Sequence, residues 1–235
     1  MRRCAKTALR ACFDHREDKP MDKLTGTLDI IKSSKLIAIS RGLYGDRLVK
    51  ATLALYKGGV RAFEAAFVKT LPVEKTVECI KELVRCLPQD AVVGAGTVLE
   101  TEQLDAAFEA GASFFVAPNT DGRVIAQAKR LGMVSIPGAL TPTEIAGAYE
   151  FGADIVKVFP AGTMGVQYFK QIKAPLAHIP MAAVGGLDHA NIRAFYDAGA
   201  VAFGISGSLY NKTHIENGEY SLITEAAKRY ADILK

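Results

Sequence analysis

Residues 152–159 read GADIVKVF: a glycine closes one segment, and a short apolar run of strand-forming residues opens the next. The same phrase, a Gly-Gly or Gly-Ala pair followed by an apolar run, recurs at Gly58-GVRAF, Gly111-ASFF and Gly199-AVAF. Glycine often ends helices, because it adopts positive φ without the steric penalty that other residues meet. Each copy of the phrase therefore predicts the end of a helix and the start of a strand.

Along the rest of the chain, short apolar runs alternate with longer segments in which apolar residues recur with the period of a helix, such as Val73–Cys86 and Glu102–Ala110. Strands separated by helices pair in parallel, with right-handed crossovers. Eight such units predict a (β/α)8 TIM barrel, a closed parallel sheet, with an open doubly wound sheet as the alternative. No G-x-G-x-x-G motif opens a helix, which disfavours a dinucleotide-binding sheet. The eight runs are Lys35–Ser40, Ala62–Phe67, Ala91–Ala95, Ser113–Ala117, Val134–Pro137, Asp154–Phe159, Met181–Val184 and Val201–Ile205.

The composition excludes several classes of protein. The chain has 235 residues, 49% of them hydrophobic and 23% charged, which is enough apolar material for a large core. No uncharged apolar stretch is long enough to span a membrane. The net charge of +4 supplies no basic face for nucleic acid. The four cysteines (Cys4, Cys12, Cys79 and Cys86) lack C-x-x-C spacing, and the histidines are scattered, so we expect reduced thiols, a cytoplasmic protein and no metal site.

The first twenty residues differ from the rest of the chain. They carry six basic and three acidic side chains and lack the apolar run of a secretory signal. We expect residues 1–20 to be a poorly ordered or locally helical extension. Residues 21–235 are then expected to form a single barrel domain, since no break in composition divides them.

Lys157 stands in the middle of the predicted strand Asp154–Phe159, on the same face as Ile155 and Phe159. A buried ammonium is costly unless it is paired or loses its proton. The lysine could be structural, paired to a carboxylate or reaching to the strand end. Alternatively, an apolar barrel interior would lower its pKa from about 10.4 and make it a nucleophile that forms a Schiff base with a ketone.

Glu64 occupies a similar position in the run Ala62–Phe67. Alternation places it with Ala62 and Ala66 on one face, which should point into the barrel, while the bulkier residues meet the helices. Barrel interiors usually hold large branched side chains, so a carboxyl between two alanines is unusual. It could simply pair with Lys157, or it could act as a general acid and base during imine chemistry.

Two further features lie at predicted strand ends. Thr97, in Val92-VGAGTVL, presents a hydroxyl that could cap a helix or contact a substrate. The glycine-rich ends Val184-GGL and Gly204-ISGS could be tight turns. They could also let backbone N–H groups approach a phosphate or another anion, as often happens after the last two strands of a barrel.

Taken in order, these stretches resemble the KDPG/KHG aldolase family. The resemblance runs from about residue 28 to residue 235 and rests on the motifs Gly58-GVRAFE, Val93-GAGTVL, Phe115-VAPN, Ile136-PGALTPTE, Val156-KVFPA, Val184-GGL and Gly207-SL. It implies a (β/α)8 barrel, usually a homotrimer, with no metal or organic cofactor, that cleaves a 2-keto-3-deoxy acid by a covalent imine. It also implies pyruvate and an aldehyde as products.

The resemblance assigns roles to particular positions. It implies that Lys157 is the Schiff-base lysine and Glu64 the general acid and base, in agreement with the reading of the residues themselves. The remaining implied substrate contacts are Arg41, Thr97, Pro118, Gly185, Gly186, Gly207 and Ser208.

The chain departs from the family where an arginine helps to hold the substrate carboxylate. The family often reads E-V-T-L-R-T, whereas this chain reads Glu64-AAFVKT. Ungapped, the threonine becomes Ala66 and the arginine becomes Val68. Lys69 could replace the arginine after a slip of one residue, although a lysine is a point charge rather than a bidentate fork.

The expected substrate is 2-dehydro-3-deoxy-6-phosphogluconate, cleaved to pyruvate and glyceraldehyde 3-phosphate, with 4-hydroxy-2-oxoglutarate as a further substrate. Three alternatives stay open at this point. The barrel could be a phosphosugar isomerase or epimerase, a ligand-binding barrel without catalysis, or a metal-dependent aldolase.

Overall fold

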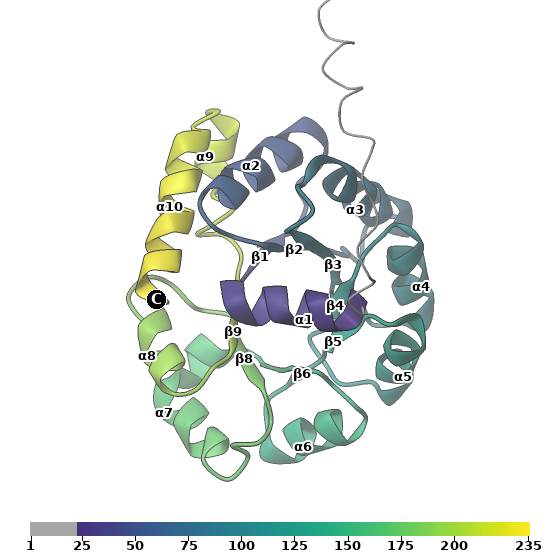
Figure 1. Cartoon of the computed structure of the whole chain (residues 1–235), viewed down its shortest axis with the longest axis vertical. Coiled ribbons are helices and arrows are strands. Elements are labelled where there is room, and N and C mark those ends of the chain that lie inside the picture. The colour runs from purple at the N-terminus through teal and green to yellow at the C-terminus, as the bar shows by residue number, and fades with distance from the viewer. Residues whose placement is uncertain (1–22) are drawn as a thin grey trace, which may run out of the picture.

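The computed structural model describes residues 23–235 and forms a barrel of parallel strands surrounded by helices (Figure 1). The expected extension, residues 1–20, lies outside the described residues. Each of the eight predicted runs overlaps a strand, although the third strand extends one residue beyond its predicted run, to Gly96. The strands are β1 (Leu36–Ser40), β2 (Ala62–Ala66), β3 (Val92–Gly96), β4 (Phe114–Val116), β5 (Val134–Ile136), β6 (Gly138–Ala139), β7 (Val156–Val158), β8 (Met181–Val184) and β9 (Ala202–Ile205).

The strands are hydrogen-bonded in the order β5-β4-β3-β2-β1-β9-β8-β7-β6, and all of the pairs are parallel. Strands β5 and β6 belong to one continuous segment, separated only by Pro137, which has no N–H to donate to a strand ladder. Because β5 pairs with β4 and β6 with β7, this segment closes the sheet. The fold is the (β/α)8 barrel that the alternation predicts, with its fifth strand divided in two.

Helices follow the strands and form the outer ring. They are α2 (Gly45–Lys57), α3 (Val73–Cys86), α4 (Thr101–Glu109), α5 (Gly122–Leu131), α6 (Pro142–Glu150), α7 (Ala161–Lys173), α8 (Ile192–Asp197), α9 (Lys212–Glu216) and α10 (Tyr220–Ile233). The recurring glycine phrases do end helices. The glycines that adopt positive φ after α2, α4, α6 and α8 are Gly59, Gly111, Gly152 and Gly199, with φ between 93° and 103°.

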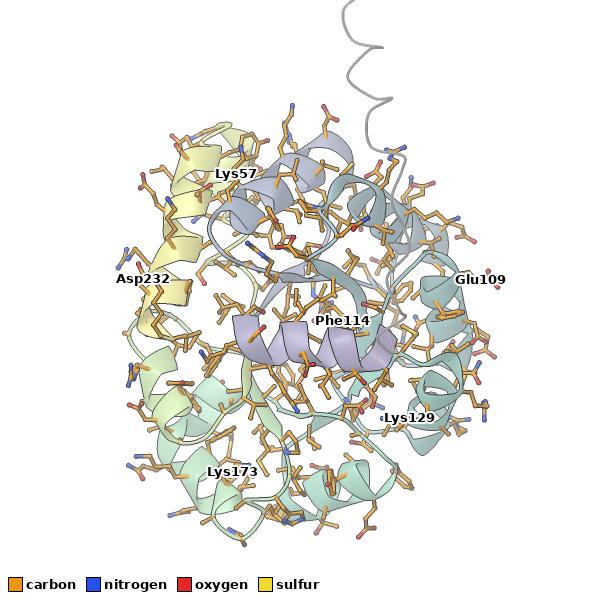
Figure 2. All side chains as sticks on the ribbon, in the orientation of Figure 1. Lys57, Glu109, Phe114, Lys129, Lys173 and Asp232 are labelled. Atoms are coloured by element: carbon orange, nitrogen blue, oxygen red, sulfur yellow. The ribbon has the colours of Figure 1, made fainter. Side chains whose placement is uncertain are left out.

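Strand alternation divides the core into two parts. Phe63 and Ala65 of β2 pack between the barrel and the helices, whereas Ala62 belongs to the cluster inside the barrel. Ile155 also lies in the inner cluster, on the face that the sequence assigns to Lys157. Figure 2 shows the same division, with Phe114 inside the ring and charged side chains such as Lys57, Glu109 and Asp232 outside.

The helix α1 (Lys23–Ser34), which the sequence pattern did not predict, lies across one end of the barrel (Figure 1). Ile31 is fully buried and belongs to the inner cluster, and Leu24 and Leu28 pack against it. Covering this end removes apolar interior side chains from water, which stabilises the barrel. The carboxyl ends of the strands, at the other end, carry the polar residues considered next.

Candidate active site

A cavity of about 620 Å³ opens among the carboxyl ends of the strands and the loops that follow them. This is the end at which (β/α)8 barrels hold their reacting groups. Nine of the ten predicted site residues line it: Arg41, Glu64, Thr97, Pro118, Lys157, Gly185, Gly186, Gly207 and Ser208. The structure thus gathers side chains from β2, β7 and the loops after β1, β3, β4, β8 and β9.

Lys157 projects from the middle of β7 and is 8% exposed. Its strand neighbours in register are Gly138 and Ala182, whose small side groups leave room around the amine. Burial lowers the pKa of Lys157, the nearby Arg41 lowers it further, and the Glu64 carboxyl opposes the shift. The nitrogen lies 4.8 Å from the centre of the Phe159 ring. Within the described chain, no hydrogen bond or ion pair holds the amine.

Glu64 projects from β2 and is 2% exposed. Burial raises the pKa of this carboxyl from 4.5 to about 7, although Lys157 and Arg41 both oppose the shift. Its Oε2 atom is buried and has no hydrogen-bond partner among the described residues. A buried carboxyl with a free oxygen and a pKa near neutrality can both accept and return a proton.

The position of Glu64 depends on Gly96 on the neighbouring strand. A Cβ atom built on Gly96 would lie 1.7 Å from Glu64 Oε1. The carboxyl therefore occupies the space that any larger residue at this position would fill. This explains in physical terms why the GAGT stretch has a glycine directly before Thr97.

Thr97 and Arg41 form a polar pair at the mouth of the barrel. The Arg41 Nη2 group donates a hydrogen bond of 2.9 Å to Thr97 Oγ1. Thr97 has φ of +58°, a left-handed conformation that is costly for a β-branched residue. Helix α4 begins at Thr101 with Glu100 as its N-cap, so Thr97 is not a helix cap. Its strained backbone and its bond to Arg41 instead place its hydroxyl at the cavity.

The glycine-rich ends of β8 and β9 also line the cavity. Gly185 and Gly186 have φ of +88° and +71°, and Gly186 is fixed by the Asn191 side chain, which donates to its carbonyl at 2.9 Å. Among the described residues, no protein acceptor receives the backbone N–H groups of Gly186, Gly207 or Ser208. Backbone N–H groups without an acceptor, in two adjacent loops that line a cavity, suit an anion such as a phosphate. The Ser208 hydroxyl shares a hydrogen bond of 2.7 Å with Tyr230.

One predicted substrate contact lies elsewhere. Lys69 lines an adjoining cavity of about 230 Å³, together with Phe67, Leu71 and Leu99. That cavity shares Thr97 with the main one, but the structure does not bring Lys69 among the residues that surround Lys157. The loop after β2 carries Lys69 away from the barrel axis, because β2 ends at Ala66 and α3 begins outside it at Val73.

The cavity is also lined by residues that the sequence did not predict to lie in the site, among them Phe159, Leu187 and Ser206. Alternation could have found Phe159, since it shares a strand face with Lys157. Ser206 directly precedes Gly207, so the anion-binding reading of this loop could have included it. No sequence pattern predicts that Leu187 lines the cavity, because its position depends on the conformation of the turn at Gly185 and Gly186.

Within residues 23–235, no three His, Cys, Asp or Glu side chains form a group that could hold a metal ion. No helix in that range combines the length and the apolar character that a bilayer crossing requires.

The barrel and its polar cavity define an enzyme that acts on a small molecule at the carboxyl ends of its strands. Comparison with known proteins makes this more specific. Residues 28–226 match the model of the KDPG and KHG aldolase family, so the chain belongs to that family of carbon–carbon lyases.

Two relatives and a solved structure agree with this assignment. The 2-dehydro-3-deoxy-6-phosphogalactonate aldolase of Escherichia coli is 37% identical over 176 residues, which cover 74% of this chain and 84% of the relative. The KHG/KDPG aldolase of the same organism is 33% identical over 185 residues, covering 78% and 84%. A solved structure described as native KDPGal has a TM-score of 0.76 and 34% identity, covering 85% of this chain and 95% of that one.

Proposed function

We propose that this aldolase cleaves a 6-phosphorylated 2-keto-3-deoxy acid to pyruvate and glyceraldehyde 3-phosphate through an imine on Lys157. The observation that carries the proposal is a buried amine with a lowered pKa that shares a cavity with a buried carboxyl of raised pKa. A second reaction, cleavage of 4-hydroxy-2-oxoglutarate to pyruvate and glyoxylate, uses the same chemistry without a phosphate.

The first stage is formation of the imine. The neutral Lys157 amine attacks the C2 ketone of the substrate and forms a carbinolamine. Burial supports this step, because it disfavours the charged ammonium and so increases the fraction of neutral amine at neutral pH. Protonated Glu64 donates a proton to the departing hydroxyl, and water leaves. The resulting iminium ion withdraws electrons from C3.

The second stage is cleavage of the carbon–carbon bond. The Glu64 carboxylate accepts the proton of the C4 hydroxyl, and the electron pair of the C3–C4 bond moves into the iminium group. An aldehyde leaves and an enamine of pyruvate remains on Lys157. Protonation of the enamine at C3 and addition of water to the imine then release pyruvate and restore the free amine. Glu64 suits both roles, because a pKa of about 7 allows it to gain and lose a proton at neutral pH.

Two groups of residues orient the substrate. Arg41 has guanidinium N–H groups besides the one that donates to Thr97, and we assign them to the substrate carboxylate. We assign this role to Arg41 rather than to Lys69, because Arg41 lines the cavity whereas Lys69 does not. The N–H groups of Gly186, Gly207 and Ser208, in the loops after β8 and β9, donate to the phosphate.

The name of the relative at 37% identity, 2-dehydro-3-deoxy-6-phosphogalactonate aldolase, supports a 6-phosphorylated substrate. The relative at 33% identity is a KHG/KDPG aldolase. The C4 configuration is the difference that remains between the two phosphorylated acids. The homotrimer and the cytoplasmic location that the sequence leads us to expect stay predictions.

The function is tested by measuring pyruvate release from three acids: 2-dehydro-3-deoxy-6-phosphogluconate, its phosphogalactonate epimer and 4-hydroxy-2-oxoglutarate. We expect the phosphorylated acids to have the lower KM, and Lys157→Ala to abolish turnover of all three. Lys173→Ala is the matched control, because Lys173 is also partly desolvated but donates to the carbonyls of Ala177 and Ile179 outside the cavity. Turnover that persists in Lys157→Ala would contradict the proposal.

A further inference from the structure

A second cavity, of about 450 Å³, adjoins the catalytic one, and most of the residues that line it have no role in the proposed mechanism. The two cavities share Arg41, Ser206 and Gly207, which form the wall between them. The remaining lining comes from the loop after β1, the first turn of α2 and the region of α9. A volume of this size lies in the range of small-molecule binding sites.

The charged side chains around this second cavity are mainly positive. Arg41, Arg47 and Lys212 line it, and Glu216 is the acidic side chain among the described lining residues. Glu216 lies 3.7 Å from Lys212 and balances that charge. Arg47 has no hydrogen-bond or ion-pair partner within the described chain. Its guanidinium is therefore available to a ligand.

The other surfaces of the second cavity are apolar. Leu43, Tyr210 and Ile215 line it, and the last two are 8% and 5% exposed. The Tyr210 hydroxyl is already paired with Thr52 at 2.8 Å, so the residue offers mainly its ring to the cavity. Free inorganic phosphate would use the cations alone and would make no contact with these apolar side chains.

We propose that the second cavity binds a small organic anion, a carboxylate or phosphate ester with an apolar body, at a site separate from the substrate site. The Arg47 guanidinium holds the acidic group, with Lys212 nearby, and the body of the ligand packs on Tyr210 and Ile215. Charge-assisted hydrogen bonds from a guanidinium provide the attraction, and burial of the apolar body adds to it. The ligand then lies beside the substrate, on the other side of Arg41.

The test uses isothermal calorimetry on the full chain with two probes, phenyl phosphate and inorganic phosphate. We expect phenyl phosphate to bind more tightly than inorganic phosphate, because it also covers the apolar surface. Arg47→Ala should weaken the binding of phenyl phosphate about ten-fold or more. Lys50→Ala is the matched control on the same helix, since Lys50 pairs with Asp46 and does not line the cavity. Its affinity for phenyl phosphate should equal that of the unaltered chain.

A second control separates this site from the substrate site. The catalytic cavity is itself proposed to hold a phosphate, so Ser208→Ala, which changes only that cavity, should leave in place the phenyl phosphate binding that Arg47→Ala weakens. Loss of binding in Ser208→Ala but not in Arg47→Ala would overturn the proposal, and so would a failure of phenyl phosphate to bind or equal affinity for the two probes. The assay needs no turnover, so it stands whether or not Lys157 forms an imine.

Discussion

Gly96→Ala should remove most of the activity by displacing a carboxyl on the neighbouring strand. The new Cβ atom would lie 1.7 Å from Glu64 Oε1, whereas real contacts of this kind are not found below 3.0 Å. Glu64 must therefore retreat by about 1.3 Å, the difference between the two distances. A displacement of about 1 Å in a reacting group can lower the rate by about 100-fold. We expect kcat to fall by about that factor, with a smaller change in KM.

The assay is steady-state pyruvate release by Gly96→Ala, by Glu64→Ala and by the double variant. If Gly96 acts by leaving room for the carboxyl, Gly96→Ala should have little further effect once the carboxyl is absent. Equal rate losses from Gly96→Ala with and without Glu64 would refute this reasoning.

Gly94→Ala is the control for damage to the fold. Gly94 lies on the same strand face as Gly96, but its added Cβ would meet the Phe114 ring at 2.4 Å rather than the carboxyl. Such overpacking should cost stability of about 1–3 kcal/mol. We expect its kcat to fall much less than that of Gly96→Ala, with both variants measured below their unfolding temperatures.

Three other substitutions test separate parts of the site. Burial raises the pKa of the Glu64 carboxyl from 4.5 to about 7, so the folded protein binds the carboxyl proton more tightly than the unfolded chain does. The contribution of this group to the free energy of unfolding therefore falls as the pH rises from 4.5 to about 7. Urea titrations should therefore show Glu64→Gln to be more stable than the unaltered chain by about 3 kcal/mol at about pH 8 and by much less at about pH 5; equal differences at the two pH values would contradict the raised pKa. Thr97→Gly should relieve the left-handed strain and raise the free energy of unfolding by about 1 kcal/mol, while the lost bond to Arg41 raises the KM for the keto acid; a less stable variant with unchanged KM would count against the assigned role. Tyr230→Phe should raise the KM for phosphorylated acids by about two- to ten-fold and leave that for 4-hydroxy-2-oxoglutarate unchanged, since its hydroxyl orients Ser208; the same rise for all substrates would exclude a role in phosphate binding.

Local patterns predicted the barrel well, because a strand that alternates with a helix has few ways to pack. The period of two placed Glu64 and Ala62 on the inner face without any knowledge of the partner strands. The helix α1 was missed because its sequence, KLTGTLDIIKSS, has a weak helical pattern. That helix is stabilised by packing against the end of the barrel, which depends on residues far along the chain.

The parts of the site that the sequence could not reveal are those made by distant contacts. Arg41 and Thr97 are 56 positions apart, so the hydrogen bond that joins them has no signature in either motif. Lys69 was predicted to replace the family arginine because it lies one residue after the matching position, Val68. The loop after β2 places Lys69 in another cavity. The second cavity likewise needs Arg47 and Lys212, which only the closed barrel brings together.

The imine between Lys157 and a keto acid is the step on which the proposed reaction depends. The most direct measurement is incubation of the enzyme with pyruvate and borohydride, followed by mass spectrometry of its peptides. Reduction of an imine should leave a stable adduct on the peptide that contains Lys157, and Lys173 provides an internal comparison because its amine donates to two backbone carbonyls. We expect an adduct on Lys157 and none on Lys173. An unmodified Lys157, or an adduct on a different lysine, would contradict the proposed reaction.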